Sequence, residues 1–468
     1  MEEDMSYVAV ISSCSIFETT GSETYRFRVF FGRGRRVQYR NTVCMHGICA
    51  MQCSSSALRS GFLKSQTEYN TPWRNDPGCF YLRKTQRHGG QILMTDEMKD
   101  REYMELALDL ALKGCGKVDP NPLVGAVIVK DGEIIGRGYH TEYGKLHAER
   151  EALADCGSSP EGAVMYVTLE PCCHQGKQPP CTDAVIDAGI SRVVIGSADP
   201  NPLVAGKGIE ILKAHGIEVV EGFMKEKCDA INPAFFRFIK TGMPYVVMKY
   251  AMTMDGKIAT RTGASKWITS EAARKRVHED RNRYMAIMAG IGTVLKDDPL
   301  LTCRIPGGRD PVRVICDTHL RIPVDSQIVQ TAKKYRTLIA TAENGGSETG
   351  ADKCSALTEK GCEILYIPVK NGHIDLEQLM KKLGEQKISS VLLEGGGTLN
   401  WSALGAGIVD RLQVYIAPKI FGGKDAPSPV GGAGVGMPAE AFLTEKPKVT
   451  FIGEDILIES EVKRCSRE

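Results

Sequence analysis

Hydrophobic residues recur at two different spacings along the chain, and from residue 94 onward the two spacings alternate. Helix-like spacing appears first at Met104, Leu108 and Ala111, and Gly114 follows as an expected helix end. Short apolar runs bounded by turn residues predict strands, at 124–129, 133–137, 163–168 and 192–195. Because each run lies next to a helical pattern, residues 94–240 are predicted to form one α/β domain.

The same alternation continues beyond a short linker at 240–244, where Gly and Pro interrupt both spacings. Mostly apolar runs predict a second set of strands, at 245–254, 284–290, 313–317, 337–340, 364–369, 391–394, 412–417, 449–452 and 455–459. A polar helical pattern that ends at Arg283 lies between the first two of these runs. A second α/β domain is therefore predicted over residues 243–468, and the fold class of the whole is α/β.

The first 93 residues differ from the rest in both pattern and charge. Apart from a weak apolar run at 25–31, they contain no sustained helix or strand spacing. Their 10 Arg and 2 Lys against 7 acidic residues give a net charge of +5, whereas the rest of the chain carries −3. Arg outnumbers Lys only in this first segment. We expect residues 1–93 to be an unstructured extension that takes no part in function.

Three interpretations of this extension stay open. One is a disordered tail. Another is an organelle transit peptide, but such peptides are poor in acidic residues and this one would contain Glu2, Glu3 and Asp4. The third, which we favour, is a leader read as protein by mistranslation, with native initiation at Met94 or Met98. Purine-rich codons for Gly89-Gly90 would resemble a ribosome-binding stretch just before Met94.

Composition and charge narrow the class of protein. The chain has 42% hydrophobic and 25% charged residues, which is typical of a globular protein. No apolar run approaches the roughly 18 residues of a membrane span, and a net charge of +2 gives no reason to expect nucleic acid or a membrane as partner. The 16 cysteines are widely spaced and no secretory signal precedes them. We therefore expect a cytoplasmic protein with small-molecule partners, and a homo-oligomer stays open.

Three short motifs in the first domain carry the side chains of a catalytic zinc site. They are His147-Ala148-Glu149, Pro171-Cys172-Cys173-His174 and Cys181. One imidazole and two thiolates make three ligands for a tetrahedral zinc and leave the fourth position for water, whose pKa the metal lowers to about 7. Glu149 would then transfer protons. This is a zinc deaminase pattern, although eight residues separate Cys172 from Cys181 where two are usual.

The second domain contains one good candidate for a phosphate-binding loop. Glycines at 395–397 directly follow a predicted strand and precede a helical run, so their backbone can approach a pyrophosphate at a helix N-terminus. A formal G-x-G-x-x-A match at 434–439 is rejected because no strand precedes it and Pro429 and Pro438 interrupt it.

Both halves resemble one family, the bifunctional deaminase/reductases of riboflavin biosynthesis. The first half carries the resemblance in four segments, 119–125, 147–149, 169–181 and 199–208. The second half carries it in five, 249–259, 265–269, 292–304, 394–399 and 414–419. The wide cysteine gap fits this family better than nucleoside or tRNA deaminases. The resemblance covers essentially all of 94–468. It implies a cytidine-deaminase-like three-layer domain followed by a dihydrofolate-reductase-like α/β domain.

The resemblance also implies a role for individual residues. In the first domain it implies that His147, Cys172 and Cys181 are the zinc ligands. It also implies that Glu149 transfers protons and that Asn121 lies beneath the pyrimidine. In the second domain it implies an NADPH site formed by Ala251, Trp267, Thr293, Asp297, Thr318, Gly396, Gly397, Thr398, Leu399, Asn400, Trp401 and Ser402. It implies substrate contacts at Lys249, Ser265, Arg281, Leu301, Arg304 and Glu394. The two arginines suit a phosphate because guanidinium groups bind oxyanions in pairs of hydrogen bonds.

The implied function is a two-step reaction in riboflavin biosynthesis. The first step is hydrolytic deamination of 2,5-diamino-6-ribosylamino-4(3H)-pyrimidinone 5′-phosphate, and the second is NADPH reduction of the ribosyl side chain to ribityl. One alternative is a nucleoside or nucleic-acid zinc deaminase fused to a folate-type reductase; the lack of a basic or aromatic-rich patch argues against its nucleic-acid form. Another is a binding module in which four protein ligands hold a structural zinc.

Overall fold

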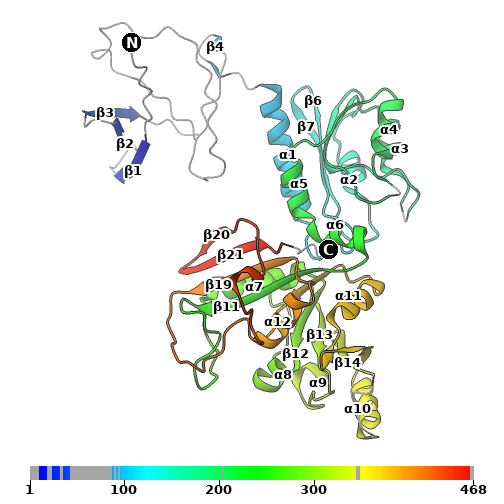
Figure 1. Ribbon diagram of the computed structural model, residues 1–468. Helices are drawn as coiled ribbons and strands as arrows, with labels where there is room; N and C mark the ends of the chain where they lie inside the picture. The colour runs from blue at the N-terminus through cyan, green and yellow to red at the C-terminus, as the bar shows by residue number, and fades with distance from the viewer. Residues whose placement is uncertain are drawn as a thin grey trace. The chain divides into compact units, whose positions relative to one another are not determined.

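The computed structural model describes residues 10–17, 24–31, 35–42, 87–88, 91–92 and 95–463, apart from 177, 203 and 344–347 (Figure 1). Residues 1–84 and 85–468 form two compact units, which are considered separately. Among the residues described, no helix is both long and apolar enough to cross a membrane.

The first unit contains a small antiparallel sheet where we expected no regular structure. Its strands are β1 (Val10–Phe17), β2 (Thr24–Phe31) and β3 (Arg35–Thr42), in that order. The weak apolar run at 25–31, the exception noted in the sequence, falls in β2. Most other residues of this extension lie outside the described part, and its interpretation as a tail or leader stays a prediction. A two-residue pair, β4 (Arg87–His88) and β5 (Gln91–Ile92), opens the second unit.

The first α/β domain begins at a capped helix and is built on a five-stranded sheet. The Thr95 side chain accepts a hydrogen bond from the Met98 backbone N–H at the start of α1 (Asp96–Leu112). The sheet has the order β10-β9-β8-β6-β7, and only β8, β9 and β10 run parallel. Its strands are β6 (Gly125–Lys130), β7 (Glu133–Tyr139), β8 (Val164–Leu169), β9 (Arg192–Ser197) and β10 (Glu218–Val220).

Helices cover both faces of this sheet, which gives the three layers that we predicted (Figure 1). One face packs against α1 and α5 (Lys225–Ile231). The other face packs against α2 (Ala148–Ala154), α3 (Cys181–Asp187) and α4 (Lys207–Ala214). The last helix, α6 (Pro233–Thr241), ends at Gly242, whose φ of 68° is readily adopted by glycine, and so leads into the predicted linker.

Two glycines explain how closely α2 approaches the sheet. A Cβ atom on Gly138 of β7 would lie 2.2 Å from the Ala152 backbone nitrogen, and one on Gly136 would lie 2.3 Å from the Ala152 carbonyl oxygen. Backbone atoms of a helix cannot give way as a flexible side chain can. The sequence Gly-Arg-Gly in β7 therefore sets the distance at which α2 lies over the sheet.

The second α/β domain is built on a nine-stranded sheet of order β15-β14-β13-β12-β18-β11-β19-β21-β20. Strands β15 to β19 in this order are parallel, and β21 is antiparallel to both of its neighbours. The strands are β11 (Tyr245–Thr253), β12 (Ala286–Gly290), β13 (Val312–Cys316), β14 (Thr337–Ala342), β15 (Cys362–Ile367), β18 (Ser390–Leu393), β19 (Arg411–Ala417), β20 (Lys448–Ile452) and β21 (Asp455–Glu461).

Apolar side chains of this second sheet form separate cores on its two faces. One core includes α11 (Leu376–Glu385) and α12 (Gly397–Gly405), and the other includes α8 (Ile291–Asp297), α9 (Gln327–Gln330) and α10 (Glu348–Glu359). Helix α7 (Glu271–Arg283) packs near β19 and β21, a small hairpin joins β16 (Val369–Lys370) to β17 (His373–Ile374), and a short 3-10 helix spans Pro438–Glu440. All nine predicted strands are present, and the α/β class is confirmed.

Candidate active sites

Three side chains converge on one point in the first domain, as the motifs predicted. His147 Nδ1, Cys172 Sγ and Cys181 Sγ all lie within 4.8 Å of one another. The His147 nitrogen is 3.5 Å from the Cys172 sulfur and 3.4 Å from the Cys181 sulfur. One nitrogen and two sulfurs at these separations fit a tetrahedral zinc, whose bonds to such atoms measure about 2.0 and 2.3 Å.

Local structure explains why residues so far apart in sequence meet. His147 is the residue preceding α2, Cys181 is the first residue of α3, and Cys172 follows shortly after β8. The Cys181 backbone N–H also donates to the Cys172 sulfur at 3.4 Å. Hydrogen bonding from Cys181, reinforced by His147, lowers the pKa of the Cys172 thiol to about 4. A thiolate at this position is the form that binds metal.

Glu149 lies beside this cluster in the first turn of α2. Only 3% of its surface is exposed, and burial raises the pKa of its carboxyl to about 7. It lines the same cavity as His147 and Cys172. A carboxyl group with a pKa near neutrality can both accept and return a proton, as a proton-transfer role requires.

The cavity at this site has a volume of about 300 Å³ and also contains Asn121. The Asn121 side-chain N–H₂ donates to His140 Nε2 at 3.1 Å, and His140 Nδ1 donates to the Leu146 carbonyl oxygen at 2.9 Å. His140 therefore fixes the orientation of the Asn121 amide. Burial lowers the pKa of His140, which favours the neutral imidazole that this arrangement needs. Sequence reasoning missed His140; its position directly after β7 was the available signal.

The loop at 199–208, which the resemblance places near the ribose phosphate, is organised by a buried carboxylate. Glu170 accepts hydrogen bonds from four backbone N–H groups of this loop and the start of α4, those of Asp199, Gly206, Gly208 and Ile209. Its surface is only 3% exposed. Asp199 and Asn201 in turn line the cavity, as does His174. Glu170 was not predicted as a functional residue.

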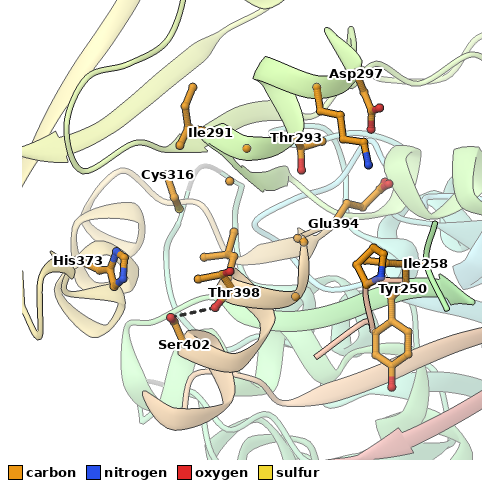
Figure 2. Close-up of a pocket in the computed structure, with 18 of the residues that line it drawn as sticks. Tyr250, Ile258, Ile291, Thr293, Asp297, Cys316, His373, Glu394, Thr398 and Ser402 are labelled. Carbon is orange, nitrogen blue, oxygen red and sulfur yellow. Dashed lines mark hydrogen bonds between the residues drawn. The ribbon is translucent and has the colours of Figure 1, made fainter. Parts of the chain in front are cut away.

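A larger cavity of about 760 Å³ lies at the carboxyl ends of the parallel strands of the second domain (Figure 2). It is lined by residues that we predicted to bind cofactor, namely Ala251, Thr293, Asp297, Thr318, Gly396, Gly397, Thr398, Leu399 and Ser402. Three predicted substrate residues, Lys249, Ser265 and Glu394, line it as well. In an open parallel sheet, this edge is the usual place for a ligand crevice.

Glu394 is the centre of a charged group at this cavity. Its carboxylate accepts from Arg281 at 2.8 and 3.1 Å and from Lys249 at 3.4 Å. Burial alone would raise the pKa of Glu394, but Arg281 and Lys249 outweigh burial and hold that pKa at about 2. The carboxylate is thus ionised at every physiological pH. Arg281 donates to Glu394 from Nε and Nη2, and its Nη1 donates to the Thr302 carbonyl oxygen.

Several predicted residues of the second site lie outside the cavity lining. Trp267 is 65% exposed with the Arg274 guanidinium 4.5 Å from its ring centre, and Trp401 packs edge-on against Phe442. Asn400 is buried and donates to the Pro429 carbonyl oxygen. The other three are Arg281, Leu301 and Arg304, of which Leu301 is buried and Arg304 exposed. Their binding roles stay predictions.

The lining also includes Gly395 of the predicted phosphate loop and residues to which the sequence analysis gave no individual binding role. These are Tyr250, Ile258, Ala259, Gly290, Ile291, Gly292, Lys296, Cys316, His319, Arg321, His373, Ile374, Leu376 and Pro427. Several of these directly follow β12 or β13, so the rule that ligands bind beyond the carboxyl ends of parallel strands could have indicated them.

The fold and the two sites together define a class of protein, a deaminase of the zinc-binding type joined to a reductase. Two family models match accordingly: the cytidine and deoxycytidylate deaminase zinc-binding region over residues 97–197, and the RibD C-terminal domain over residues 244–458.

Curated relatives and solved structures agree on one family. Riboflavin biosynthesis protein RibD of Actinobacillus pleuropneumoniae is 52% identical over 362 residues, which are 77% of this chain and 95% of that protein. RibD of Escherichia coli (strain K12) is 40% identical over 77% of this chain and 99% of that protein. The structure of Acinetobacter baumannii RibD, form 1, superposes with a TM-score of 0.70 at 35% identity, covering 79% of this chain and all of that one.

A further solved structure, from Thermotoga maritima, is titled a diaminohydroxyphosphoribosylaminopyrimidine deaminase/5-amino-6-(5-phosphoribosylamino)uracil reductase. It superposes with a TM-score of 0.69 at 38% identity, covering 79% of this chain and all of that one. The chain belongs to the RibD family. It is an enzyme of riboflavin biosynthesis with a deaminase domain followed by a reductase domain, so the predicted family, fold class and general function are confirmed.

Proposed function

We propose that this chain deaminates 2,5-diamino-6-ribosylamino-4(3H)-pyrimidinone 5′-phosphate with the help of zinc and then reduces the ribosyl group of the product with NADPH. The observation that carries the first half is the convergence of His147, Cys172 and Cys181 beside the buried Glu149 at a cavity. The name of the Thermotoga maritima protein supports the choice of substrate for both halves.

In the first reaction, the chain's own residues bind the pyrimidine and move protons. A zinc ion held by His147, Cys172 and Cys181 would supply Lewis acidity that activates water at neutral pH. Glu149 accepts a proton from the attacking water and delivers it to the departing amino group, so that water is consumed and ammonia released. Asn121, oriented by His140, offers its amide to the ring. Because the pKa of Glu149 is about 7, its carboxyl group can take up and release a proton at neutral pH.

In the second reaction, the cavity of the reductase domain binds cofactor and substrate side by side. A bound NADPH would supply the hydride that reduces the sugar carbon C1′. The glycines at 395–397 and the first residues of α12 line this cavity, and their backbone N–H groups would hold the pyrophosphate of the cofactor. Lys249 and the ionised Glu394 stand at the other end of the cavity, where hydrogen-bond donors and acceptors for the ribose are needed.

The decisive experiment separates the two reactions by one substitution. Glu149→Gln removes the proton carrier but keeps the size of the side chain, so ammonia release should fall by a factor of about 10² to 10⁴. Reduction of the deaminated substrate should be unchanged, and zinc content, measured by atomic absorption, should stay at one per chain. Glu151→Gln, on the same helix but outside the cavity lining, is the matched control. Full deamination by Glu149→Gln with zinc bound would refute the assignment.

A further inference from the structure

The reductase cavity is elongated across the sheet, and its two ends differ in chemistry. Its lining residues follow four neighbouring parallel strands, in the spatial order β13, β12, β18 and β11. The outermost two of these strands are three strand intervals apart, about 14 Å at the usual spacing. Glu394 follows β18 and Lys249 belongs to β11, so the predicted substrate contacts lie toward one end.

The middle of the cavity contains a group of glycines. Gly290 and Gly292 stand at the end of β12, and Gly395 to Gly397 follow β18. A Cβ atom on Gly292 or Gly396 would meet nothing within 4 Å, so the backbone at these two positions is open. Helix α12, which has nine residues, begins here, so its N-terminus lies at this part of the cavity. The middle therefore suits the pyrophosphate of a dinucleotide.

The end beyond β13 gathers basic side chains. His319, Arg321 and His373 line the cavity there. Figure 2 shows His373 near Cys316 and on the opposite side of the cavity from Glu394, whereas Asp297 lies on the same side as Glu394. The two acidic side chains of the lining are thus both away from this basic end.

Buried polar contacts hold this basic end in place. Arg321 Nε lies 3.9 Å from Oδ1 of Asp317, a fully buried carboxylate whose other oxygen accepts from the Ile322 backbone N–H. The Thr318 hydroxyl accepts from the Ile374 backbone N–H at 3.2 Å, which fixes the β16–β17 hairpin and brings His373 next to the end of β13. Arg321 itself remains 57% exposed, so its guanidinium is accessible to a ligand.

We propose that His319, Arg321 and His373 bind the phosphate on the adenosine 2′ position of NADPH and thereby select NADPH over NADH. The inference rests on the proposed NADPH-dependent reduction and adds the residues that discriminate between the two cofactors. NADH carries only a hydroxyl at the 2′ position. A phosphate monoester there accepts charge-assisted hydrogen bonds from the Arg321 guanidinium and further hydrogen bonds from the ring N–H groups of His319 and His373. The order nicotinamide, pyrophosphate, 2′-phosphate along a dinucleotide matches the order Glu394, glycine loop, Arg321 along the cavity.

The substrate also carries a phosphate monoester, but the basic end lies on the wrong side for it. Two strand intervals, about 10 Å, separate β13 from β18 and hence the basic end from Glu394. The pyrophosphate of the cofactor would occupy the space between. The cluster of His319, Arg321 and His373 therefore binds the phosphate of the cofactor rather than that of the substrate. Binding experiments with a fragment of the cofactor and a fragment of the substrate distinguish the two phosphates.

The test measures binding to the full chain by calorimetry, without turnover. Adenosine 2′,5′-bisphosphate should bind at least about tenfold more tightly than adenosine 5′-monophosphate. Arg321→Gln should weaken the bisphosphate by about tenfold, since one charge-assisted contact is lost, and change the monophosphate by less than about twofold. His373→Ala should act in the same direction. Arg101→Ala, which removes an exposed arginine from α1, is the control for net charge and should alter neither.

Three results would overturn the inference. The first is equal binding of the two adenosine phosphates by the unaltered chain. The second is an Arg321→Gln variant that loses affinity equally for the bisphosphate and the monophosphate while its melting temperature matches that of the unaltered chain. If Arg321→Gln does not fold, the same comparison is made with His373→Ala. The third is weakened binding of ribose 5-phosphate in place of the bisphosphate, which would assign the cluster to the substrate. Equal reduction rates with NADPH and NADH would contradict this inference but not the proposed function. Tighter binding of the bisphosphate without any reduction of the ribosyl group would contradict only the proposed function.

Discussion

Single carboxylates organise both cavities, and they do so in opposite electrostatic ways. Glu394 is surrounded by cations and ionised, whereas Glu149 is buried with a pKa raised to about 7. Glu170 is a third case, in which backbone N–H groups rather than cations satisfy the buried oxygens. The environment of Glu394 therefore suits a permanently charged carboxylate, and that of Glu149 suits one that transfers a proton. The environment of Glu170 suits a carboxylate that fixes a loop.

The role of Glu170 can be tested by removing its acceptors. Glu170→Ala leaves four backbone donors without their partner, and each buried unpaired donor costs about 1–3 kcal/mol unless water replaces the carboxylate. We expect the KM of deamination to rise by about tenfold or more. Zinc content must be measured as well, because the ligand Cys172 is only two residues from Glu170. Steady-state kinetics and zinc analysis check this. Glu161→Ala, at an exposed position, is the control, and an unaltered KM in Glu170→Ala would remove Glu170 from the site.

For single residues, the sequence was enough to identify side chains that belong to a recognisable motif. It was not enough to identify side chains whose role depends on which residues the fold places beside them. His147, Glu149, Cys172 and Cys181 could be recognised because metal ligation demands particular residue types at particular spacings. His140 and Glu170 could not, because a lone histidine or glutamate carries no spacing rule. Their function arises only when the fold brings them to Asn121 and to the 199–208 loop.

Helix α2 is the element on which the first reaction depends, since it carries Glu149 and begins directly after His147. Its position is set by glycine contacts with β7 rather than by side-chain packing alone. Gly138→Ala should push α2 away from the sheet, because a Cβ atom there meets backbone at 2.2 Å. We expect a loss of about 1–3 kcal/mol in the free energy of unfolding, as for other overpacked sites, and weaker zinc binding.

Chelator competition for zinc and denaturant unfolding measure these two effects of Gly138→Ala. Gly157→Ala is the matched control, since nothing lies within 4 Å of the added Cβ atom there and its φ is not positive. Zinc affinity equal to that of the unaltered chain would mean that the position of α2 does not govern the ligand cluster.

Strands were the most predictable elements, and short or irregular elements the least. Continuous apolar runs such as 337–340 become fully buried strands covered on both faces, which is the reason for their unbroken hydrophobicity. The β16–β17 hairpin escaped prediction because its strands have two residues each, too few to show a period. It is nevertheless the element that brings His373 to the cavity, and helix α12 turns Asn400 and Trp401 away from it.

Within residues 85–468, the deaminase and reductase domains meet close to a segment of the deaminase cavity. Arg309 Nη2 lies 2.9 Å from Asp119 Oδ2, and the Arg309 backbone N–H donates to the Asn282 side chain. Asp119 is two residues before Asn121 of the deaminase cavity, and Asn282 is next to Arg281, the partner of Glu394. Arg309 therefore connects segments of the chain that lead, within two residues, to Asn121 of one site and Arg281 of the other.

Arg309→Ala tests whether this contact influences deamination. Burial raises the pKa of Asp119 and Arg309 opposes that rise, so the substitution should raise the pKa further. In the variant, the buried and unpaired Asp119 carboxylate destabilises this contact at high pH. The destabilisation disappears as the pH falls and the carboxyl becomes protonated. We expect a severalfold higher KM for deamination, with a defect that grows with pH, and an unchanged KM for reduction. Lys360→Ala is the control, and a pH-independent defect would argue against the carboxylate.

The hydrogen bond at Thr95 has a practical consequence for choosing where an expressed polypeptide should start. A chain whose first residue is Met94 keeps this cap and all of α1, whereas one that starts at Met98 lacks the cap and the first acidic turn. Loss of such a cap costs about 1 kcal/mol. The longer of the two truncated proteins should therefore melt at the same temperature as the deaminase domain of the full-length chain, and the shorter one a few degrees lower. A thermal scan of both polypeptides would measure this difference.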